Sequence, residues 1–366
     1  MLLSEFDFTL PEELIAQQPT SKREQSRMMV LDKSEKTIEH KHFFDILDYL
    51  GENDVLVLNN TKVIPARLLG QKTTGANIEI FLLKDKGNKQ WEALVKPSKR
   101  VNSDNIIKVC DELSVKTLVR LDSGKWLVEL LYDGADCDIY DLLERVGKVP
   151  LPPYIQRKLT TEKIEKLDHQ RYQTVFAKNI GSVAAPTAGL HFTKEILKEL
   201  KDKGVQICYV TLNVGLGTFR PVKCDNILEH KMDSETFEIS KQTAQIINNA
   251  KEAGKKIVAV GTTSVRTLET AFQKYGEIKE CHDASELFIY PPYEFKVVDK
   301  LITNFHLPKS TLLMLVSSLA GGVNVLENCD TTENPFVGRD FILKAYNEAI
   351  SEKYRFYSYG DCMLIK

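Results

Sequence analysis

Residues 255–276 read KKIVAVGTTSVRTLETAFQKYG, and this stretch decides the fold class. The first part, 255–261, is an apolar run rich in β-branched residues, as expected of a buried strand. The second part, 262–276, follows a helical pattern and ends at Gly276, a residue that commonly terminates helices. A strand that leads directly into a helix is the repeating unit of α/β proteins.

The same alternation recurs on both sides of this stretch. By the same criteria we expect helices at 10–18, 43–50, 193–204, 241–254, 310–322 and 339–354, and strands at 28–32, 54–60, 182–186, 205–212, 286–290 and 362–365. Ser310 is a suitable N-cap for its helix. Alternating strands and helices predict a largely parallel sheet or barrel.

The segment 68–131 has a different texture. It consists of short runs rich in β-branched and aromatic residues, such as IEIFLL, WEALV and WLVELL, separated by polar turns. This pattern is typical of a small all-β unit, and we expect a barrel. Pro150, Pro152 and Pro153 then interrupt regular structure and mark a hinge or linker.

These two sequence patterns together predict one discontinuous domain with an insertion. We expect an α/β domain with a barrel-like, mixed sheet at 1–62 and 154–366, and an inserted β-barrel domain at 63–153. The alternative is two sequential domains that follow an N-terminal arm. We favour the insertion because 54–60 (DVLVLNN) is too apolar to be anything other than a core strand.

Composition excludes several classes of protein. The net charge of −2 gives no overall support for nucleic-acid binding, so any RNA contact requires a local patch. Seven scattered cysteines without a CxxC pair, and seven histidines without HExxH, predict neither disulfides nor a metal site. The N-terminus does not resemble a signal peptide, and the most apolar run, 311–320, is too short to cross a bilayer. We therefore expect a cytoplasmic protein that does not enter the membrane.

Ligands of α/β proteins bind at the carboxyl ends of strands. Loops at such positions supply the candidate residues Thr187, Gly189, His191, Gly217, His230, Glu235, Gly261, Thr262, Thr263, Ser264, Arg266, Asn304 and His306. His191 can titrate near neutral pH, and the 261–264 loop can hold an anion with help from Arg266. Helix capping and ordinary packing explain the same residue types, so each position has a structural alternative.

Basic and polar residues near the predicted insertion are candidates for RNA contact. They are Asn60, Lys62 and Arg67 in NNTKVIPAR, Lys96, Lys99 and Arg100 in KPSKR, and Arg157 and Lys158. Such residues can neutralise phosphates or reach a base edge. A hydrogen-bonded domain junction and a solvated turn explain them equally well.

Long strings match one known family in order along the whole chain. They are FDFTLPEELIAQQP, LVLNNTKVIPARL, PLPPYI, YQTVFA, GSVAAPTAGLHFT, VGLGTFRPV, AVGTTSVRTLE, TNFHLPKSTLLMLV and YRFYSYGDCMLI. The chain resembles the S-adenosylmethionine:tRNA ribosyltransferase-isomerases of queuosine biosynthesis. This resemblance implies an α/β domain with an inserted β-barrel, as the residue patterns also predict.

The resemblance also implies a reaction. The ribosyl part of S-adenosylmethionine moves to 7-aminomethyl-7-deazaguanine at the tRNA wobble position and rearranges, which gives epoxyqueuosine and releases adenine and methionine. S-adenosylmethionine is then a consumed substrate, no other cofactor and no metal are implied, and we expect a monomer. The chain departs from the family pattern at Asn213 and Asp233, where histidine is common, and at Pro292, where glycine is common.

Those departures leave His191, His230 and His306 as candidate catalytic histidines. We hypothesise that His191 is the acid or base nearest the ribose, with His306 or Glu235 as its counterpart. Arg266 and the 261–264 loop would hold the methionine carboxylate or a phosphate.

Two other functions remain open. A generic S-adenosylmethionine-dependent RNA methyltransferase would release S-adenosylhomocysteine, and the missing GxGxG-type loop counts against it. A non-catalytic RNA-binding module would bind tRNA without any dependence on S-adenosylmethionine.

Overall fold

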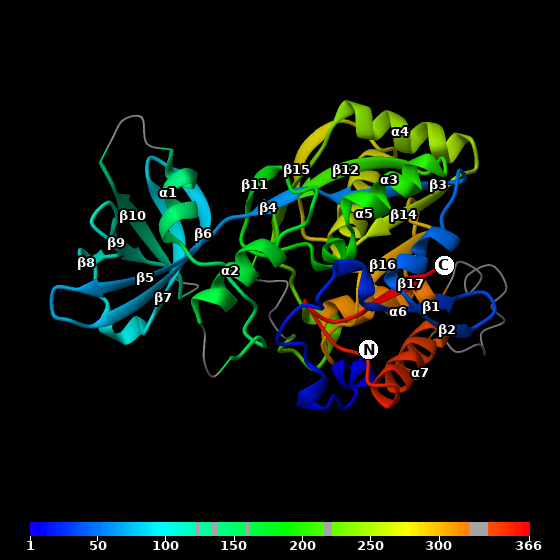
Figure 1. Cartoon of the computed structure of the whole chain (residues 1–366), viewed down its shortest axis with the longest axis horizontal. Helices are drawn as coiled ribbons and strands as arrows, with labels where there is room; N and C mark the ends of the chain where they lie inside the picture. The colour runs from blue at the N-terminus through cyan, green and yellow to red at the C-terminus, as the bar shows by residue number, and fades with distance from the viewer. Residues whose placement is uncertain (122–123, 134–137, 158–160, 216–221, 322–335) are drawn as a thin grey trace.

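A computed structural model of the chain describes residues 1–121, 124–133, 138–157, 161–215, 222–321 and 336–366 (Figure 1). Its larger sheet has the strand order β15-β13-β12-β3-β14-β16-β17-β1-β2. These strands are β1 (Arg27–Asp32), β2 (Thr37–His42), β3 (Asp54–Asn59), β12 (Gln206–Leu212), β13 (Glu235–Ile239), β14 (Lys256–Val260), β15 (Cys281–Ser285), β16 (Lys300–Asn304) and β17 (Cys362–Ile365).

The centre of this sheet is parallel and its flanks are antiparallel. β12, β3, β14 and β16 run in one direction, whereas β17 is antiparallel to β16 and β13 is antiparallel to β12. The expected mixed sheet is therefore confirmed. Its edges are β15 and β2, so the described strands form an open sheet where the sequence predicted a barrel-like one.

Helices accompany this sheet where the sequence places them. They are α3 (Lys194–Asp202), α4 (Lys241–Glu252), α5 (Thr262–Tyr275), α6 (Thr311–Gly321) and α7 (Val337–Ser351). Local chemistry sets their ends: the predicted cap Ser310 accepts a hydrogen bond from the Leu313 N–H (3.2 Å), and Gly276 ends α5 in the left-handed conformation.

A closed barrel forms a second structural unit, as predicted. Its strand order is β10-β7-β6-β5-β8-β9, and β10 closes it by pairing with β9. The strands are β5 (Arg67–Lys72), β6 (Asn77–Gly87), β7 (Gln90–Lys96), β8 (Ile106–Lys108), β9 (Ser114–Arg120) and β10 (Trp126–Leu131). The helix α1 (Ile139–Val146) contributes Leu142 and Leu143 to the barrel core.

Two short strands lie where the chain passes between the barrel and the larger sheet (Figure 1). β4 (Thr61–Val63) precedes the barrel, and β11 (Asn179–Ser182) follows α2 (Glu162–Arg171); the two strands pair in parallel. The strands therefore divide in the order expected of an insertion. The exact boundaries at 62/63 and 153/154 stay a prediction.

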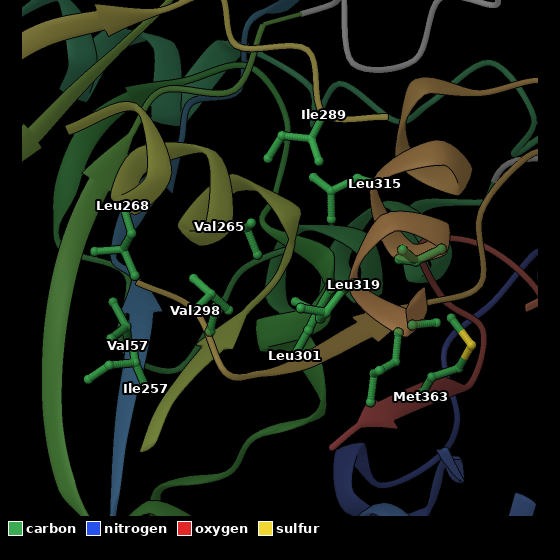
Figure 2. Packing of buried hydrophobic residues seen from close by; sticks show 14 of the residues in the cluster. Val57, Ile257, Val265, Leu268, Ile289, Val298, Leu301, Leu315, Leu319 and Met363 are labelled. Carbon is green, nitrogen blue, oxygen red and sulfur yellow. The ribbon is translucent and has the colours of Figure 1, made fainter. Parts of the chain in front are cut away.

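The main core lies between the sheet and the helices that cover it. Figure 2 shows Val57, Ile257 and Leu301 of the sheet beside Leu268 of α5 and Leu319 of α6, all of them buried. A separate cluster fills the barrel and includes both tryptophans, Trp91 and Trp126. Each cluster removes its own apolar surface from water, which is the main force that holds such units together.

Four expected elements differ from the structure. The helix predicted at 10–18 is a single 3-10 turn, η2 (Glu12–Leu14), because Ile15 bridges to Phe356 instead of continuing the helix. The helix predicted at 43–50 is the 3-10 helix η4 (Phe43–Asp48). The strand predicted at 182–186 ends at Ser182 as β11.

The fourth difference concerns 286–290, which was predicted as a strand. The strand lies earlier, at β15, and the carbonyl of Leu287 accepts a hydrogen bond from the Arg266 side chain (3.2 Å). The other 3-10 helices within the described ranges are η1 (Leu3–Phe6), η3 (Arg23–Gln25), η5 (Ser98–Arg100), η6 (Thr187–His191) and η8 (Ile227–Glu229). Within the described ranges, no helix is long and apolar enough to span a membrane.

Candidate functional site

The carboxyl ends of β12, β3, β14 and β16 meet at one edge of the sheet because these strands are parallel. Asn59 connects three of the loops that begin there. Its amide nitrogen donates to the Leu212 carbonyl (3.0 Å) and to the Thr263 hydroxyl (3.2 Å), and its oxygen accepts from the Thr61 N–H (3.1 Å). This buried amide holds the strand ends in a fixed arrangement.

A small cavity of about 70 Å³ opens at this edge. It is lined by Tyr154, Ala185, Pro186, Thr187, Ala188, Val214, Gly261, Thr262, Thr263, Thr303, Asn304, Phe305, His306, Leu307, Ser310, Leu312, Tyr357 and Ser358. The structure thus brings together six predicted site residues from three separate loops: Thr187, Gly261, Thr262, Thr263, Asn304 and His306.

Asn304 contributes a buried hydrogen-bond acceptor to the cavity lining. Its amide nitrogen donates to His191 Nε2 (3.1 Å) and to the carbonyls of Tyr357 (3.2 Å) and Asp361 (3.3 Å). These carbonyls fix the orientation of the amide. The Oδ1 atom is buried and has no hydrogen-bond partner among the described residues, so it is a ready acceptor for a donor on a ligand.

His191 lies behind Asn304 and is absent from the residues that line the cavity. Its Nδ1 atom is 2.6 Å from the Ser26 hydroxyl, which itself donates to the Arg23 carbonyl. Nδ1 therefore carries the hydrogen, and Nε2 accepts from Asn304. Burial, together with nearby Arg23, Arg355 and Arg171, lowers the pKa of His191 to about 3. The prediction that His191 titrates near neutral pH is wrong.

His306, in contrast, faces the cavity. Its Nε2 atom is 3.0 Å from the Thr303 hydroxyl, and its backbone N–H donates to the Tyr346 hydroxyl (2.9 Å). Burial lowers the pKa of His306 to about 3. The imidazole is therefore neutral at physiological pH and is held in one orientation.

Arg266 and Glu235 form a buried ion pair with each other. Arg266 also donates to the carbonyls of Leu287 and Ser285 (3.2 Å each), and Glu235 accepts from the Gly215 N–H (2.8 Å). Neither residue lines the cavity. For Arg266 to bind a substrate carboxylate, or for Glu235 to act as an acid or base, this ion pair would have to open.

The remaining predicted residues of this group are dispersed. His230 is half-buried against the ring of Phe288 (centroids 5.3 Å apart), and burial lowers its pKa. A Cβ at Gly189 would lie 2.8 Å from Phe176, so packing explains this glycine. Ser264 donates to the Val260 carbonyl (2.8 Å). Gly217 lies outside the described residues.

The predicted RNA-contact residues before the barrel have partners within the chain. Lys62 pairs with Glu144 (2.9 Å), and Arg67 pairs with Glu79 (2.7 Å). Asn60 accepts a hydrogen bond from the Thr211 hydroxyl (2.7 Å). The alternative of a well-bonded junction explains these three positions.

Lys96, Lys99 and Arg100, in contrast, are exposed on β7 and η5 of the barrel. Arg157 differs from its prediction, because its side chain is buried and pairs with Asp168. Its neighbour Lys158 lies outside the described residues. Among the described candidates, the barrel group is therefore the one that presents its charge to solvent without a carboxylate partner.

A larger cavity of about 850 Å³ lies between the barrel and α2. Its lining includes the apolar side chains of Phe81, Leu94 and Ile155, and charged groups of both signs such as Lys96 and Glu165. Several of these charges pair with each other, for example Lys148 with Glu165 (2.5 Å). This cavity is large, and the positive and negative side chains that line it nearly balance each other.

Sequence reasoning missed several residues of the smaller cavity. Tyr154, Thr303, Tyr357 and Ser358 all line it, although none was a candidate. Tyr357 and Ser358 belong to the string YRFYSYGDCMLI, which the sequence marks only as a family match. Their place beside Asn304 depends on pairing across the sheet that no local pattern encodes.

Comparisons with known proteins agree on one family. The family described as "Queuosine biosynthesis protein" matches residues 3–365. A Sulfurihydrogenibium protein named S-adenosylmethionine:tRNA ribosyltransferase-isomerase is 53% identical over 366 residues, which is 100% of both chains. A crystal structure of an S-adenosylmethionine tRNA ribosyltransferase from Thermotoga maritima is 38% identical, with a TM-score of 0.54, and the match covers 99% of this chain and 100% of that one.

Proposed function

The chain belongs to the queuosine biosynthesis protein family, and from this membership we propose that it is an S-adenosylmethionine:tRNA ribosyltransferase-isomerase. In the proposed reaction, the ribosyl group of S-adenosylmethionine moves to 7-aminomethyl-7-deazaguanine at the tRNA wobble position. The product is epoxyqueuosine, and adenine and methionine leave. We further propose that the enzyme is a cytoplasmic monomer and uses no other cofactor and no metal.

One observation carries the location of the substrate site: a buried acceptor with no partner in the described part of the chain faces a cavity beside a helix N-terminus. The acceptor is Asn304 Oδ1, and the helix is α5, whose first residue follows Gly261 (φ 81°) without a side-chain cap. The first N–H groups of such a helix favour an anion, and methionine supplies a carboxylate. A substrate amino group suits the Asn304 acceptor.

The aromatic side chains of the cavity suit the charge of the substrate. Tyr154, Phe305 and Tyr357 all contribute to its lining. Aromatic faces attract cations, and the sulfonium of S-adenosylmethionine is a cation. The cavity is smaller than the roughly 300 Å³ of typical ligand sites, so we propose that its lining separates when the substrate binds.

We assign the proton transfer to His306 and a positioning role to His191. A base must remove the proton from the carbon next to the sulfonium, and His306 is the candidate histidine whose side chain lines the cavity. His191 acts through Asn304, whose amide it meets at 3.1 Å. This assignment revises the expectation that His191 itself is nearest the ribose.

Product analysis tests the reaction. The enzyme is incubated with S-adenosylmethionine and tRNA that carries the aminomethyl base, and we expect adenine and methionine in equal amounts. S-adenosylhomocysteine in their place would identify a methyltransferase. Tight tRNA binding without any consumption of S-adenosylmethionine would identify an RNA-binding module.

A substitution tests the role of His306. Because general acid–base catalysis contributes about 10²- to 10⁴-fold, His306→Gln should lower kcat by that factor while S-adenosylmethionine still binds. The matched control is His282→Gln, which changes an exposed histidine on β15 and should keep the wild-type rate. A His306→Gln enzyme with normal kcat would remove this residue from the chemistry.

We also propose that Lys96, Lys99 and Arg100 contact the tRNA, because they are the predicted basic residues that the barrel exposes. Each phosphate contact adds about 0.7–0.9 to the slope of log K against log salt. Replacing all three by Gln should therefore weaken tRNA binding and flatten that slope. An unchanged slope would reject this patch.

A further inference from the structure

Three arginines gather around the loop that holds His191. Arg23 donates to the carbonyls of Leu190 (2.9 Å), Gln170 (3.1 Å) and Gln173 (2.9 Å). Arg171 donates to the Ser21 carbonyl (3.1 Å), and Arg355 donates to the Gln18 carbonyl. Arg171 and Arg355 thus bind the segment before η3, and Arg23 binds the end of α2 and the loop that holds His191.

These arginines differ from the other arginines of the chain. The remaining buried or half-buried arginines in the described ranges each pair with a carboxylate; they are Arg27, Arg67, Arg157, Arg266 and Arg339. Arg23, Arg171 and Arg355 bind backbone carbonyls and form no such ion pair with a described residue. Neutral carbonyls satisfy N–H groups, but they do not cancel the charge.

The cluster therefore concentrates positive charge, because no described carboxylate forms an ion pair with these guanidinium groups. The field of all three guanidinium groups reaches His191 and lowers its pKa, and burial and Arg171 lower the pKa of Arg23 to about 10. Glu24 and Asp361 are near enough to act on Arg171 and Arg355 respectively. Asp361 accepts a hydrogen bond from the Arg355 backbone N–H (2.8 Å), but among the described residues neither carboxylate forms an ion pair with a guanidinium of the cluster. The Nε–H of Arg171 is also buried without a partner among the described residues.

We propose that Arg23, Arg171 and Arg355 form a binding site for a backbone phosphate of the tRNA substrate. Guanidinium groups suit phosphate oxygens because they present planar pairs of N–H donors. All three side chains remain partly exposed, so a phosphate can approach them. This site rests on the proposed function, because it assumes that the chain acts on tRNA.

The position of the cluster suits this role. Arg23 binds the Leu190 carbonyl next to His191, His191 contacts Asn304, and Asn304 lines the smaller cavity. A phosphate held at the cluster is thus separated from the cavity by two side chains. Phosphate contacts fix the register of a nucleic acid, and here they would place the wobble nucleotide at the cavity.

The test measures binding of an anticodon stem-loop RNA that carries the aminomethyl base at several salt concentrations. Arg171→Gln, Arg355→Gln and the double variant are compared with wild type; Arg23 is left intact because its carbonyl contacts make it part of the fold. Each substitution should weaken binding, and the double variant should flatten the salt slope by about 0.7–0.9, the contribution of one neutralised phosphate. KM for the RNA should rise while kcat is retained.

Two controls separate this site from a general effect of charge or folding. Lys241→Gln removes one exposed positive charge on α4 and should leave the slope unchanged. Arg171→Lys keeps the charge and should restore the slope. Weaker binding by the double variant with a wild-type slope would point to fold damage and would overturn the proposal.

The outcomes also separate this proposal from the proposed function. If wild type modifies the RNA and the arginine variants keep its Kd and salt slope, only the phosphate site is overturned. If wild type neither binds nor modifies the RNA, the proposed function fails and the phosphate site fails with it.

Discussion

At the scale of single residues, the sequence predicts the proximity of side chains better than their chemical roles. Asn304 and His306 are expected near the 261–264 loop, and the structure places both at one cavity with Gly261. The partners of His191 could not be predicted, because Ser26 lies 165 positions away and belongs to another strand end. Burial by distant segments, rather than residue type, makes this histidine neutral.

Acid should destabilise the protein through its two buried histidines. The pKa values of His191 and His306 are lowered to about 3 in the folded state, so the unfolded chain binds more protons between pH 6.5 and 3. Their contribution to stability is complete above pH 6.5 and is lost as the pH falls toward 3. Between pH 7 and pH 5, each histidine should lower the free energy of unfolding by about 2 kcal/mol, and urea unfolding measures this loss.

A pair of variants isolates this effect. His191→Gln should lower stability at pH 7 and should also reduce the loss between pH 7 and 5, because one titrating group is gone. The exposed His282→Gln is the control and should keep the wild-type pH dependence. An unchanged pH dependence in His191→Gln would contradict the neutral, buried state of this ring.

The Glu235–Arg266 pair supports a second prediction. Arg266→Ala leaves the Glu235 carboxylate buried without its partner, and such changes cost about 3–5 kcal/mol. The double variant Glu235→Gln/Arg266→Met removes both charges and should cost less than Arg266→Ala alone. Urea unfolding measures both; if Arg266→Ala is as stable as wild type, the pair has no structural role.

At the scale of elements, the predictions hold where local and tertiary signals agree. The strand before Gly261 and the helix after it occur as expected, as β14 and α5. The predictions fail where backbone groups form hydrogen bonds with residues that are distant in the sequence. The Phe356 N–H binds the Leu14 carbonyl, which stops a helix at 10–18, and Arg266 occupies the Leu287 carbonyl, which a strand at 286–290 would use.

The contact between α6 and α7 depends on one glycine. A Cβ at Gly338 would lie 2.2 Å from the Ser317 carbonyl oxygen and 2.6 Å from Gly321 Cα. Gly338→Ala should therefore destabilise the protein by about 1–3 kcal/mol, as overpacking does. Gly321→Ala is the matched control, because the nearest described atom beyond its chain neighbours would lie 3.9 Å from its Cβ. Thermal unfolding that ranks the two variants equally would contradict this close packing.

At the scale of the whole molecule, the local pattern of strands and helices in the sequence is enough to predict two structural units. Runs of short strands predict the barrel, and its closed order agrees. The way the strands of the larger sheet are ordered could not be predicted, because β3 pairs with β12 and β14, each separated from it by the whole barrel. Alternation of strands and helices indicates a fold class, but long-range pairing selects the order.

The two tryptophans provide a test of the predicted domain boundaries. Both lie in the barrel core, so their fluorescence reports barrel unfolding, whereas far-UV circular dichroism reports mainly the helices elsewhere. If 63–153 is a domain of its own, Leu130→Ala should shift the fluorescence transition by about 2–5 kcal/mol, and Leu268→Ala should shift the dichroism transition. Coincident shifts in both variants would indicate a single cooperative unit.

The open edges of the larger sheet have a consequence for association between molecules. An unpaired edge strand can recruit another chain and extend the sheet, which is a route to aggregation. β2 is such an edge, and its sequence TIEHKH is dominated by exposed polar and charged side chains, with Lys41 beside Glu39. Another molecule that paired there would have to desolvate these charges. The barrel avoids the same hazard by closure, so each unit of the protein protects its strands in a different way.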